Sequence, residues 1–192
     1  MSLPNTSNRT APDSSDTRVV TGVVRLSYAN LWEPKPMRDG KLKYSVSLII
    51  PKSDKATVAA IQAAVDAAYE EGAGKFGGKL PSKSALKLPL RDGDVDRPDD
   101  PAYANAYFVN ANSNTPPQIV DRRVKPILDR SEIYSGVYAK VSVNFYAFNS
   151  EGSRGIACGL GNVQKIRDGE ALGGRTNPED DFVTETDEDF LS

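Results

Sequence analysis

The chain has 192 residues and a net charge of −2, which fits one globular domain with tails. It contains no histidine and a single cysteine, Cys158. This excludes Ser-His-Asp and Cys-His catalysis, imidazole-dependent metal sites, a thiolate zinc site and an intramolecular disulfide. No apolar run is long enough to predict a transmembrane helix, and residues 1–17 lack the apolar centre of a signal peptide. We therefore expect a protein of a reducing compartment, with no membrane association and no metal or cofactor.

The two ends of the chain differ in composition from its middle. Residues 1–17 are rich in Ser, Thr, Asn and Pro, which predicts a disordered segment. Residues 179–192 hold seven acidic residues and no basic ones, so residues 1–178 keep a net charge of +5. The composition predicts one folded domain over residues 18–170, followed by a flexible acidic tail over residues 171–192.

The acidic tail contains two aromatic residues, Phe182 and Phe190. A tail that only keeps the protein soluble is one interpretation. The other is a partner-binding peptide, because an acidic segment with an aromatic residue near its end suits a basic groove with an apolar pocket. The residues assigned to that peptide are Asp187, Glu188, Asp189 and Phe190.

The first predicted elements are two strands and a helix. Residues 18–29 and 43–50 are expected to be strands, joined by a loop over 30–42 in which Pro34 and Pro36 block regular pairing. A helix is predicted from an N-cap at Ser53 to Gly72. Its apolar positions recur at helical spacing.

The rest of the chain is predicted to be mostly strand and loop. Residues 73–101 lack clear periodicity, and further strands are expected over 103–111, 118–121, 137–148 and 154–166. Five or six strands with one helix predict a mainly β protein, best arranged as a small curved barrel. A β-sandwich and an open α+β sheet are the alternatives.

The strand over 137–148 has two distinct faces, because alternate residues of a strand point to opposite sides. One face is wholly apolar and predicts core: Val137, Ala139, Val141, Val143, Phe145 and Ala147. The other face carries Tyr138, Lys140, Ser142, Asn144, Tyr146 and Phe148. Aromatic rings beside a lysine suit single-stranded nucleic acid, whose bases stack on rings at about 1–3 kcal/mol each and whose phosphates attract cations. Cross-strand aromatic pairing on an exposed sheet face is the alternative.

The first two strands supply cations to the same outer surface. Continuous alternation places Arg25 and Ser27 on the outer face of the first strand, opposite Val20, Val24, Leu26 and Tyr28. Lys43 is on the outer face of the second strand, and the intervening loop adds Trp32, Lys35, Arg38 and Lys41. Trp32 is interpreted either as a stacking residue or as an apolar plug over the barrel end.

Two further segments have alternative interpretations. The aspartates of residues 91–100, R-D-G-D-V-D-R-P-D-D, have two interpretations. They are either oxygen ligands for a hard divalent cation or part of a solvated turn in which they pair with Arg91 and Arg97. The glycine-rich segment 155–161 lacks the Lys-Ser/Thr pair of a phosphate loop. Within it, Cys158 is in the apolar phase of a strand and is expected to fill the core rather than to act as a nucleophile.

Several segments, in order along residues 19–170, resemble a family of tailed-phage proteins whose characterised members bind single-stranded DNA. They are V-R-L-S-Y-A-N-L-W-E-P at 24–34, K-Y-S-V-S-L-I-I-P-K at 43–52, L-R-D-G-D at 90–94, Y-S-G-V-Y-A-K-V-S-V-N-F-Y-A-F at 134–148 and G-L-G-N-V-Q-K at 159–165. The resemblance implies an OB-type barrel and a role in phage DNA replication, recombination or repair, and it assigns no role to L-R-D-G-D. The tail looks like those of other single-stranded DNA-binding proteins, which recruit replication partners and compete with DNA. It departs from them in that Leu191 and Ser192 follow Phe190.

These observations lead to one main hypothesis, a non-enzymatic protein that binds single-stranded DNA with little sequence preference in the cytoplasm of an infected bacterium. Bases would stack on Tyr138, Tyr146, Phe148 and Trp32, and phosphates would contact Arg25, Lys35, Arg38, Lys43 and Lys140. One alternative is a Mg²⁺-dependent nuclease using the aspartates of residues 92–100. The other is a phage structural or scaffold protein whose aromatic face is a subunit interface. An exposed aromatic face also suits a homodimer.

Overall fold

The computed structural model describes residues 16–150 and 152–172. The predicted N-terminal segment, apart from Asp16 and Thr17, lies outside these residues. So does the acidic tail with Asp187, Glu188, Asp189 and Phe190. The division into an N-terminal segment, a domain and a tail therefore stays a prediction.

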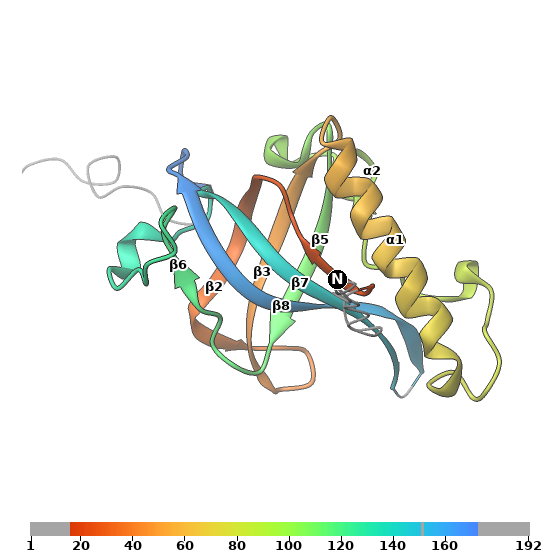
Figure 1. Cartoon of the computed structure of the whole chain (residues 1–192). Coiled ribbons are helices and arrows are strands. Elements are labelled where there is room, and N and C mark those ends of the chain that lie inside the picture. The colour runs from red at the N-terminus through yellow and green to blue at the C-terminus, as the bar shows by residue number, and fades with distance from the viewer. Residues whose placement is uncertain (1–15, 151, 173–192) are drawn as a thin grey trace, which may run out of the picture.

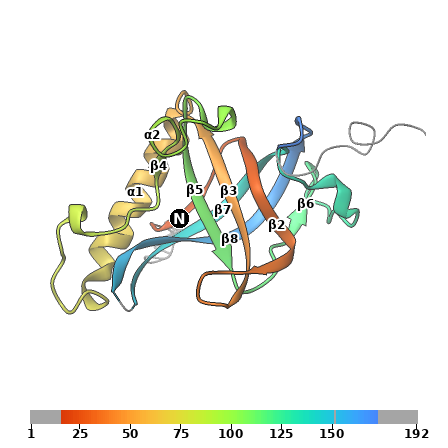
Figure 2. The same ribbon diagram turned by 180° about the vertical axis from the view of Figure 1, so that it is seen from behind.

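Five strands close into a barrel (Figures 1 and 2). They are β2 (Val24–Pro36), β3 (Leu42–Pro51), β5 (Ala106–Ser113), β7 (Tyr138–Ser150) and β8 (Ser153–Arg167). The ring runs β2–β3–β5–β8–β7 and returns to β2; β5–β8 is parallel and the other four pairings are antiparallel. The prediction of a small, mainly β barrel is confirmed over the sandwich and the open sheet.

The remaining elements decorate this ring. β1 (Arg18–Val20) pairs with β7, β4 (Arg91–Asp92) with β5, and β6 (Ile119–Val120) with β8. The helices are α1 (Lys55–Glu71) and α2 (Gly93–Asp96), with short 3-10 turns at Gly72–Gly74, Lys83–Ala85, Pro101–Tyr103 and Arg130–Glu132. No helix in the described part of the chain is long and apolar enough to cross a bilayer.

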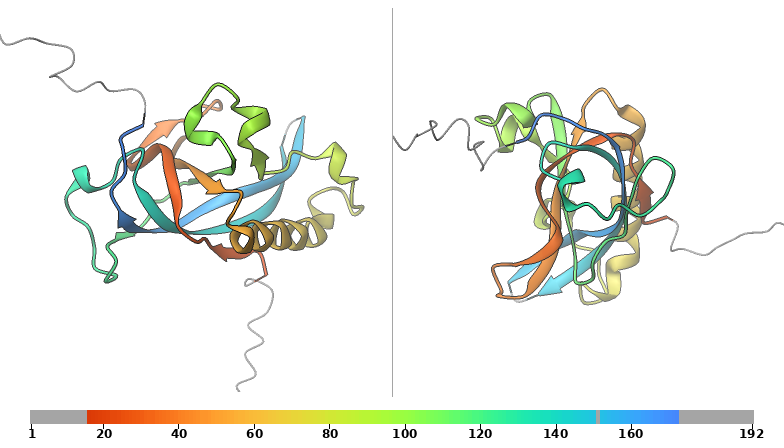
Figure 3. Two further views of the ribbon diagram at one scale, coloured as in Figure 1. Left: turned by 90° about the horizontal axis from the view of Figure 1, so that it is seen from above. Right: turned by 90° about the vertical axis from the view of Figure 1, so that its left-hand side faces the viewer.

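Helix α1 lies between β3 and β5 in the chain and packs along one side of the barrel (Figure 3). Its apolar face, with Ile61 and Val65, is buried in the main core, as the periodicity predicts. The helix begins one residue later than predicted, because Asp54 rather than Ser53 caps it by accepting a hydrogen bond from the Thr57 backbone N–H. A carboxylate oxygen satisfies a donor that would otherwise lack a partner in the first turn.

The barrel interior confirms the apolar face predicted for the strand over 137–148. Ala139, Val141, Val143 and Phe145 are all buried in the main core. Inward side chains of β2 and β3 meet them, including Leu26 and Leu48, which have no exposed surface. Cys158 of β8 is also buried, as expected for a core residue.

The predicted strand over 18–29 is wrong in one respect, because the chain breaks after β1 and a new strand starts at Val24. The break shifts the alternation, so that Val20 is 67% exposed while Thr21 is buried. The hydroxyl of Thr21 accepts a hydrogen bond from the backbone N–H of Val141. The prediction that one continuous alternation assigns the two faces of residues 18–29 is therefore wrong.

The predicted loop over 30–42 is also too long, because β2 continues to Pro36. Pro34 is tolerated because the β2–β3 ladder is irregular between Asn30 and Lys35, and Pro36 is the last residue of the strand. A residue without an N–H costs no ladder hydrogen bond at such a place. Only a tight turn around Gly40 then separates the two strands, with the Met37 N–H donating to the Lys41 carbonyl.

Candidate nucleic-acid interface

The closed ring divides the predicted contact residues between two outer surfaces. β7 and β8 face the viewer in Figure 1, and β2, β3 and β5 face the viewer in Figure 2. Tyr138, Lys140, Tyr146 and Phe148 belong to β7, whereas Lys35 and Lys43 pair with each other across β2 and β3, beside the turn that holds Arg38. The structure therefore does not bring the predicted residues into one site.

On the β7 surface, the exposed ring is Tyr146. Its side chain is 42% exposed and lies beside Gly159 of β8, where a Cβ would come within 3.5 Å of the ring. Partial burial raises the pKa of its hydroxyl. Lys140 is exposed and Phe148 is half-buried. This surface keeps the predicted combination of rings and a cation. These residues do not line either of the two clefts over β2, β3 and β5.

Tyr138 and Arg25, which pair across β7 and β2, contact the segment that follows β8. The Tyr138 ring lies 5.4 Å from the guanidinium carbon of Arg25 and 4.2 Å from that of Arg167. Arg25 donates hydrogen bonds to the backbone carbonyls of Gly136, at 3.2 Å, and Glu170, at 2.6 Å. We call residues 168–172 the C-terminal strap. Tyr138 and Arg25 are therefore occupied by contacts within the protein.

Trp32 is half-buried and packs against the main core. Its Nε1 is buried and has no hydrogen-bond partner in the described part of the chain. This position favours the interpretation of Trp32 as an apolar plug over that of an exposed stacking residue, because its ring is largely covered by protein atoms.

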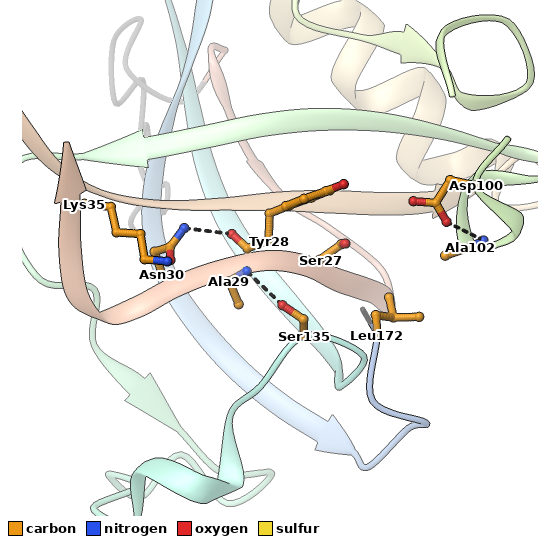
Figure 4. A pocket seen from close by; sticks show the side chains of 9 residues that line it. All are labelled: Ser27, Tyr28, Ala29, Asn30, Lys35, Asp100, Ala102, Ser135 and Leu172. Atoms are coloured by element: carbon orange, nitrogen blue, oxygen red, sulfur yellow. Dashed lines mark hydrogen bonds between the residues drawn. The ribbon is translucent and has the colours of Figure 1, made fainter. Parts of the chain in front are cut away.

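A groove runs over the outer face of β2, β3 and β5. Two adjoining clefts of about 390 and 260 Å³ form it, and both are lined by Tyr28 and Asn30. Its floor is polar, because two rows of small polar residues cross the three strands. They are Ser27–Ser47–Asn110 and Asn30–Ser45–Asn112. Lys35 lines one end, and the last described residue, Leu172, lines one side (Figure 4). Small polar side chains on the floor leave room for a ligand.

Tyr28 projects into this groove because β2 is irregular between Ser27 and Asn30. Its backbone has a φ of 47°, a left-handed conformation that is uncommon for a bulky residue and is often found at functional sites. The irregularity turns a side chain that alternation predicts for the core toward the solvent, and Tyr28 is 56% exposed. Figure 4 shows the ring projecting toward the wall that carries Asp100.

That wall is formed by residues 91–103, which we call the aspartate lobe. Arg97 of the lobe places its guanidinium carbon 5.3 Å from the centre of the Tyr28 ring, 5.4 Å from that of Tyr103 and 5.6 Å from that of Phe108. Arg97 also lines the smaller cleft. The sequence singles out neither Tyr28 nor Arg97 as a contact residue, nor the serines and asparagines of the groove floor. The left-handed break in β2 has no clear sequence signal, and the surrounding aspartates suggested an ion pair for Arg97.

Three of the five aspartates of the lobe form ion pairs within the protein. Asp92 and Asp94 each lie 2.8 Å from the Nζ of Lys52, and Asp96 lies 3.0 Å from the Nε of Arg91. Hydrogen bonds from Lys52 and from the Asn105 backbone lower the pKa of Asp94, and the two carboxylates raise the pKa of Lys52. Residues 16–150 and 152–172 include no group of three or more His, Cys, Asp or Glu placed to hold a metal ion. The Arg91 pair matches the predicted turn, whereas Arg97 contacts rings.

Cys158 is not a reactive group of either surface. It is 2% exposed, and burial raises the pKa of its thiol to about 12. The thiolate, which is the nucleophilic form, is therefore scarce near neutral pH.

Comparisons with known proteins agree with this architecture. Residues 17–191 match the model of a family described as "Enterobacter phage Enc34, ssDNA-binding protein". The chain is 31% identical over 182 residues to protein p50 of Acyrthosiphon pisum secondary endosymbiont phage 1, covering 88% of this chain and 96% of that protein.

Two solved structures are similar to the whole barrel. The single-stranded DNA-binding protein of bacteriophage Enc34, solved in complex with single-stranded DNA, is 26% identical, with a TM-score of 0.73 over 82% of this chain and 90% of that one. A single-stranded DNA-binding protein encoded by bacteriophage T7 is 15% identical, with a TM-score of 0.60 over 88% of this chain and 96% of that one. The second likeness shows the fold alone. An OB-like barrel, as the resemblance implied, is confirmed.

Proposed function

The chain belongs to the family of Enterobacter phage Enc34 single-stranded DNA-binding proteins, and from that premise we propose that it binds single-stranded DNA with little sequence preference. The observation that supports this most is the groove over β2, β3 and β5, with the exposed Tyr28 ring above a floor of serines and asparagines. A ring stacks on any base, and short polar side chains accommodate all four. The strand lies along the groove.

Cations at one end of the groove contact the phosphates. Lys35 lines the larger cleft, Lys43 is its cross-strand partner, and Arg38 lies in the turn between them. Each neutralised phosphate releases condensed counterions, so affinity falls with added salt. Among the residues predicted from sequence, these three have the best placement for this role.

The β7 surface is a second contact for a longer strand, through Lys140, Tyr146 and Phe148. Arg25, Tyr138 and Trp32 take a supporting part, because their contacts within the protein leave them less accessible. If the β7 surface is instead a homodimer or scaffold interface, light scattering will show stable assemblies that Tyr146→Ala dissolves, with DNA affinity unchanged.

The role of this binding is to protect single strands during phage DNA replication, recombination or repair, in the cytoplasm of the infected host. The protein binds and does not cleave, because Asp92 and Asp94 are engaged by Lys52 and not free for Mg²⁺. Incubation of a labelled oligonucleotide with Mg²⁺ tests this. Cleavage that disappears in a variant with Asp92→Ala and Asp94→Ala would instead support the nuclease.

The acidic tail recruits phage replication proteins through Asp187, Glu188, Asp189 and Phe190 and competes with DNA for the basic body. The strap supports this, because Leu172, the last described residue before the tail, lines the groove. Seven acidic residues follow from residue 179 onward. Such a peptide is long enough to reach along the groove, since a flexible linker spans about 5–6 Å times the square root of its length.

The deciding experiment is fluorescence anisotropy of a labelled strand of ~30 nucleotides, titrated with protein at two salt concentrations, with a matching duplex alongside. We expect tight, salt-sensitive binding of the single strand and weaker binding of the duplex. Absence of binding at low salt, for the full chain and for a chain without residues 179–192, would refute the proposed function.

A further inference from the structure

We propose that Arg97 is a preformed phosphate anchor on the wall of the groove, and that Lys52 is the positioning residue that holds the aspartate lobe in place for it. The inference rests on the proposed function, since the phosphate belongs to a strand lying in the groove. It assigns a role to the L-R-D-G-D segment that neither the motif nor the family resemblance explains.

Arg97 is a cation without an anionic partner. No carboxylate lies within ion-pair distance of it among the residues that the structure describes. Within the described part of the chain, its side chain makes one hydrogen bond, a long contact of 3.5 Å to the hydroxyl of Tyr28. The guanidinium has five N–H donors in a planar fork that matches the oxygens of a phosphate. Most of these donors remain available to a strand in the groove.

Three aromatic rings fix the orientation of that guanidinium. Tyr28, Tyr103 and Phe108 lie within 5.6 Å of its carbon. Tyr103 and Phe108 are fully buried and meet edge to face, and the Tyr103 hydroxyl donates a 2.9 Å hydrogen bond to the Ser47 hydroxyl on the groove floor. A guanidinium held over buried rings loses little freedom when it binds a phosphate.

The position of Arg97 depends on how the lobe is attached to the barrel. Lys52, at the end of β3, bridges Asp92 and Asp94 at 2.8 Å each. Asp94 also accepts a hydrogen bond from the Asn105 backbone, and Asp92 caps α2 by accepting one from the Asp94 backbone. The backbone N–H of Arg97 donates to the Gly93 carbonyl. A direct chain of contacts therefore runs from Lys52 through the L-R-D-G-D segment to Arg97.

The lobe also needs Lys52 for electrostatic reasons. It holds five aspartates, Asp92, Asp94, Asp96, Asp99 and Asp100, next to a surface that would receive a polyanion. Lys52 neutralises two of them and Arg91 a third. Asp99 and Asp100 form no ion pair among the described residues, and Arg97 is the cation that this wall presents to the groove.

The first test measures the salt dependence of single-strand binding by anisotropy. Arg97→Ala is expected to weaken binding about 10- to 100-fold, as loss of a charge-assisted hydrogen bond does, and to reduce the slope of log K against log salt by about 0.7. Arg97→Lys keeps the slope but recovers only part of the affinity. The matched control is Arg122→Ala, which removes an exposed arginine outside the groove and should leave both quantities unchanged.

The second test asks whether Lys52 acts through Arg97. Lys52→Met should weaken binding by nearly as much as Arg97→Ala, the double variant should be no weaker than Arg97→Ala alone, and Lys52→Arg should restore affinity. Additive effects would overturn the positioning role, because a general electrostatic or structural effect of Lys52 does not depend on Arg97. Circular dichroism and Tm establish that each variant is folded. If Lys52→Met is not, the same cycle is run with Lys52→Gln, and Arg97→Ala tests the anchor by itself.

The outcomes separate this inference from the proposed function. If the wild-type protein does not bind single strands, both fail. If it binds, and Arg97→Ala keeps the wild-type affinity and salt slope, the groove functions without this anchor and the inference alone is overturned.

Discussion

The guanidinium of Arg25 donates a 2.6 Å hydrogen bond to the backbone carbonyl of Glu170, 145 residues further along the chain. A second bond joins the Leu172 N–H to the Ser135 carbonyl at 2.8 Å. Together they bind the C-terminal strap across β2 and bring Leu172 to the groove. The attachment of the strap thus uses Arg25, a residue that the sequence pattern predicts as a DNA contact.

Arg25→Ala tests this reassignment. Loss of a charged hydrogen bond costs about 1.5–3 kcal/mol, so Tm should fall by several degrees and protease cleavage within the strap should become faster. DNA affinity should change much less than in Tyr28→Ala. An unchanged Tm with a weaker, less salt-dependent affinity would instead identify Arg25 as a phosphate contact. Differential scanning fluorimetry, limited proteolysis and anisotropy provide the three readings.

Tyr28→Ala and Tyr146→Ala distinguish the two outer surfaces. We expect Tyr28→Ala to weaken single-strand binding by about 1–3 kcal/mol, the value of one stacked base, with the salt slope unchanged because no charge is removed. Tyr28→Phe keeps the ring and should bind nearly as the wild type does. Tyr146→Ala should have a smaller effect on a short strand. The reverse order of the two alanine variants would place the main contact on β7.

Deletion of residues 179–192 should tighten single-strand binding at low salt. The removed segment carries seven acidic residues and the remainder a net charge of +5, so the tail and the phosphates compete for the same cations. The gain should vanish at high salt, where both attractions are screened. A control chain with the seven acids replaced by Asn and Gln keeps the length and should behave like the deletion. Equal affinity of all three proteins at low salt argues against competition.

Gly93→Ala should destabilise the aspartate lobe. A Cβ at residue 93 would overlap the backbone carbonyl oxygen of Tyr103 and lie 2.8 Å from that of Ala106, so the backbone must shift. A cost of about 1–3 kcal/mol is expected for such overpacking, seen as a fall in Tm and in DNA affinity. Gly74→Ala, where a Cβ meets nothing within 4 Å, is the control and should leave Tm close to that of the wild type.

Cys158 should resist thiol reagents in the native protein. Burial raises its pKa to about 12, so almost no thiolate is present at about pH 8, near the ordinary pKa of a free thiol. We expect no reaction with an aromatic disulfide reagent under native conditions and one equivalent after unfolding in guanidinium. Rapid native labelling would show that the β7–β8 region opens readily.

The local pattern of the sequence is sufficient for the strands that keep a regular alternation. Strict alternation over residues 137–148 predicts the core face of β7, because the period of a regular strand is independent of what it packs against. On the outer face, Ser142 is buried as well, which alternation does not predict. Helical spacing in the same way predicts the buried face of α1. The absence of histidine excludes whole classes of catalysis by itself, because those reactions need an imidazole wherever the chain would place it.

The tertiary structure decides which side chains form the site. The irregularity in β2 turns Tyr28 outward, and one such break reverses an assignment that rests on alternation. The ring closure separates Tyr146 from Lys43, although alternation predicts both for one surface. Arg97 meets Tyr28 across 69 residues of chain, and Lys52 meets Asp94 across 42. Periodicity reports the local path of the backbone, whereas these contacts depend on how distant segments pack.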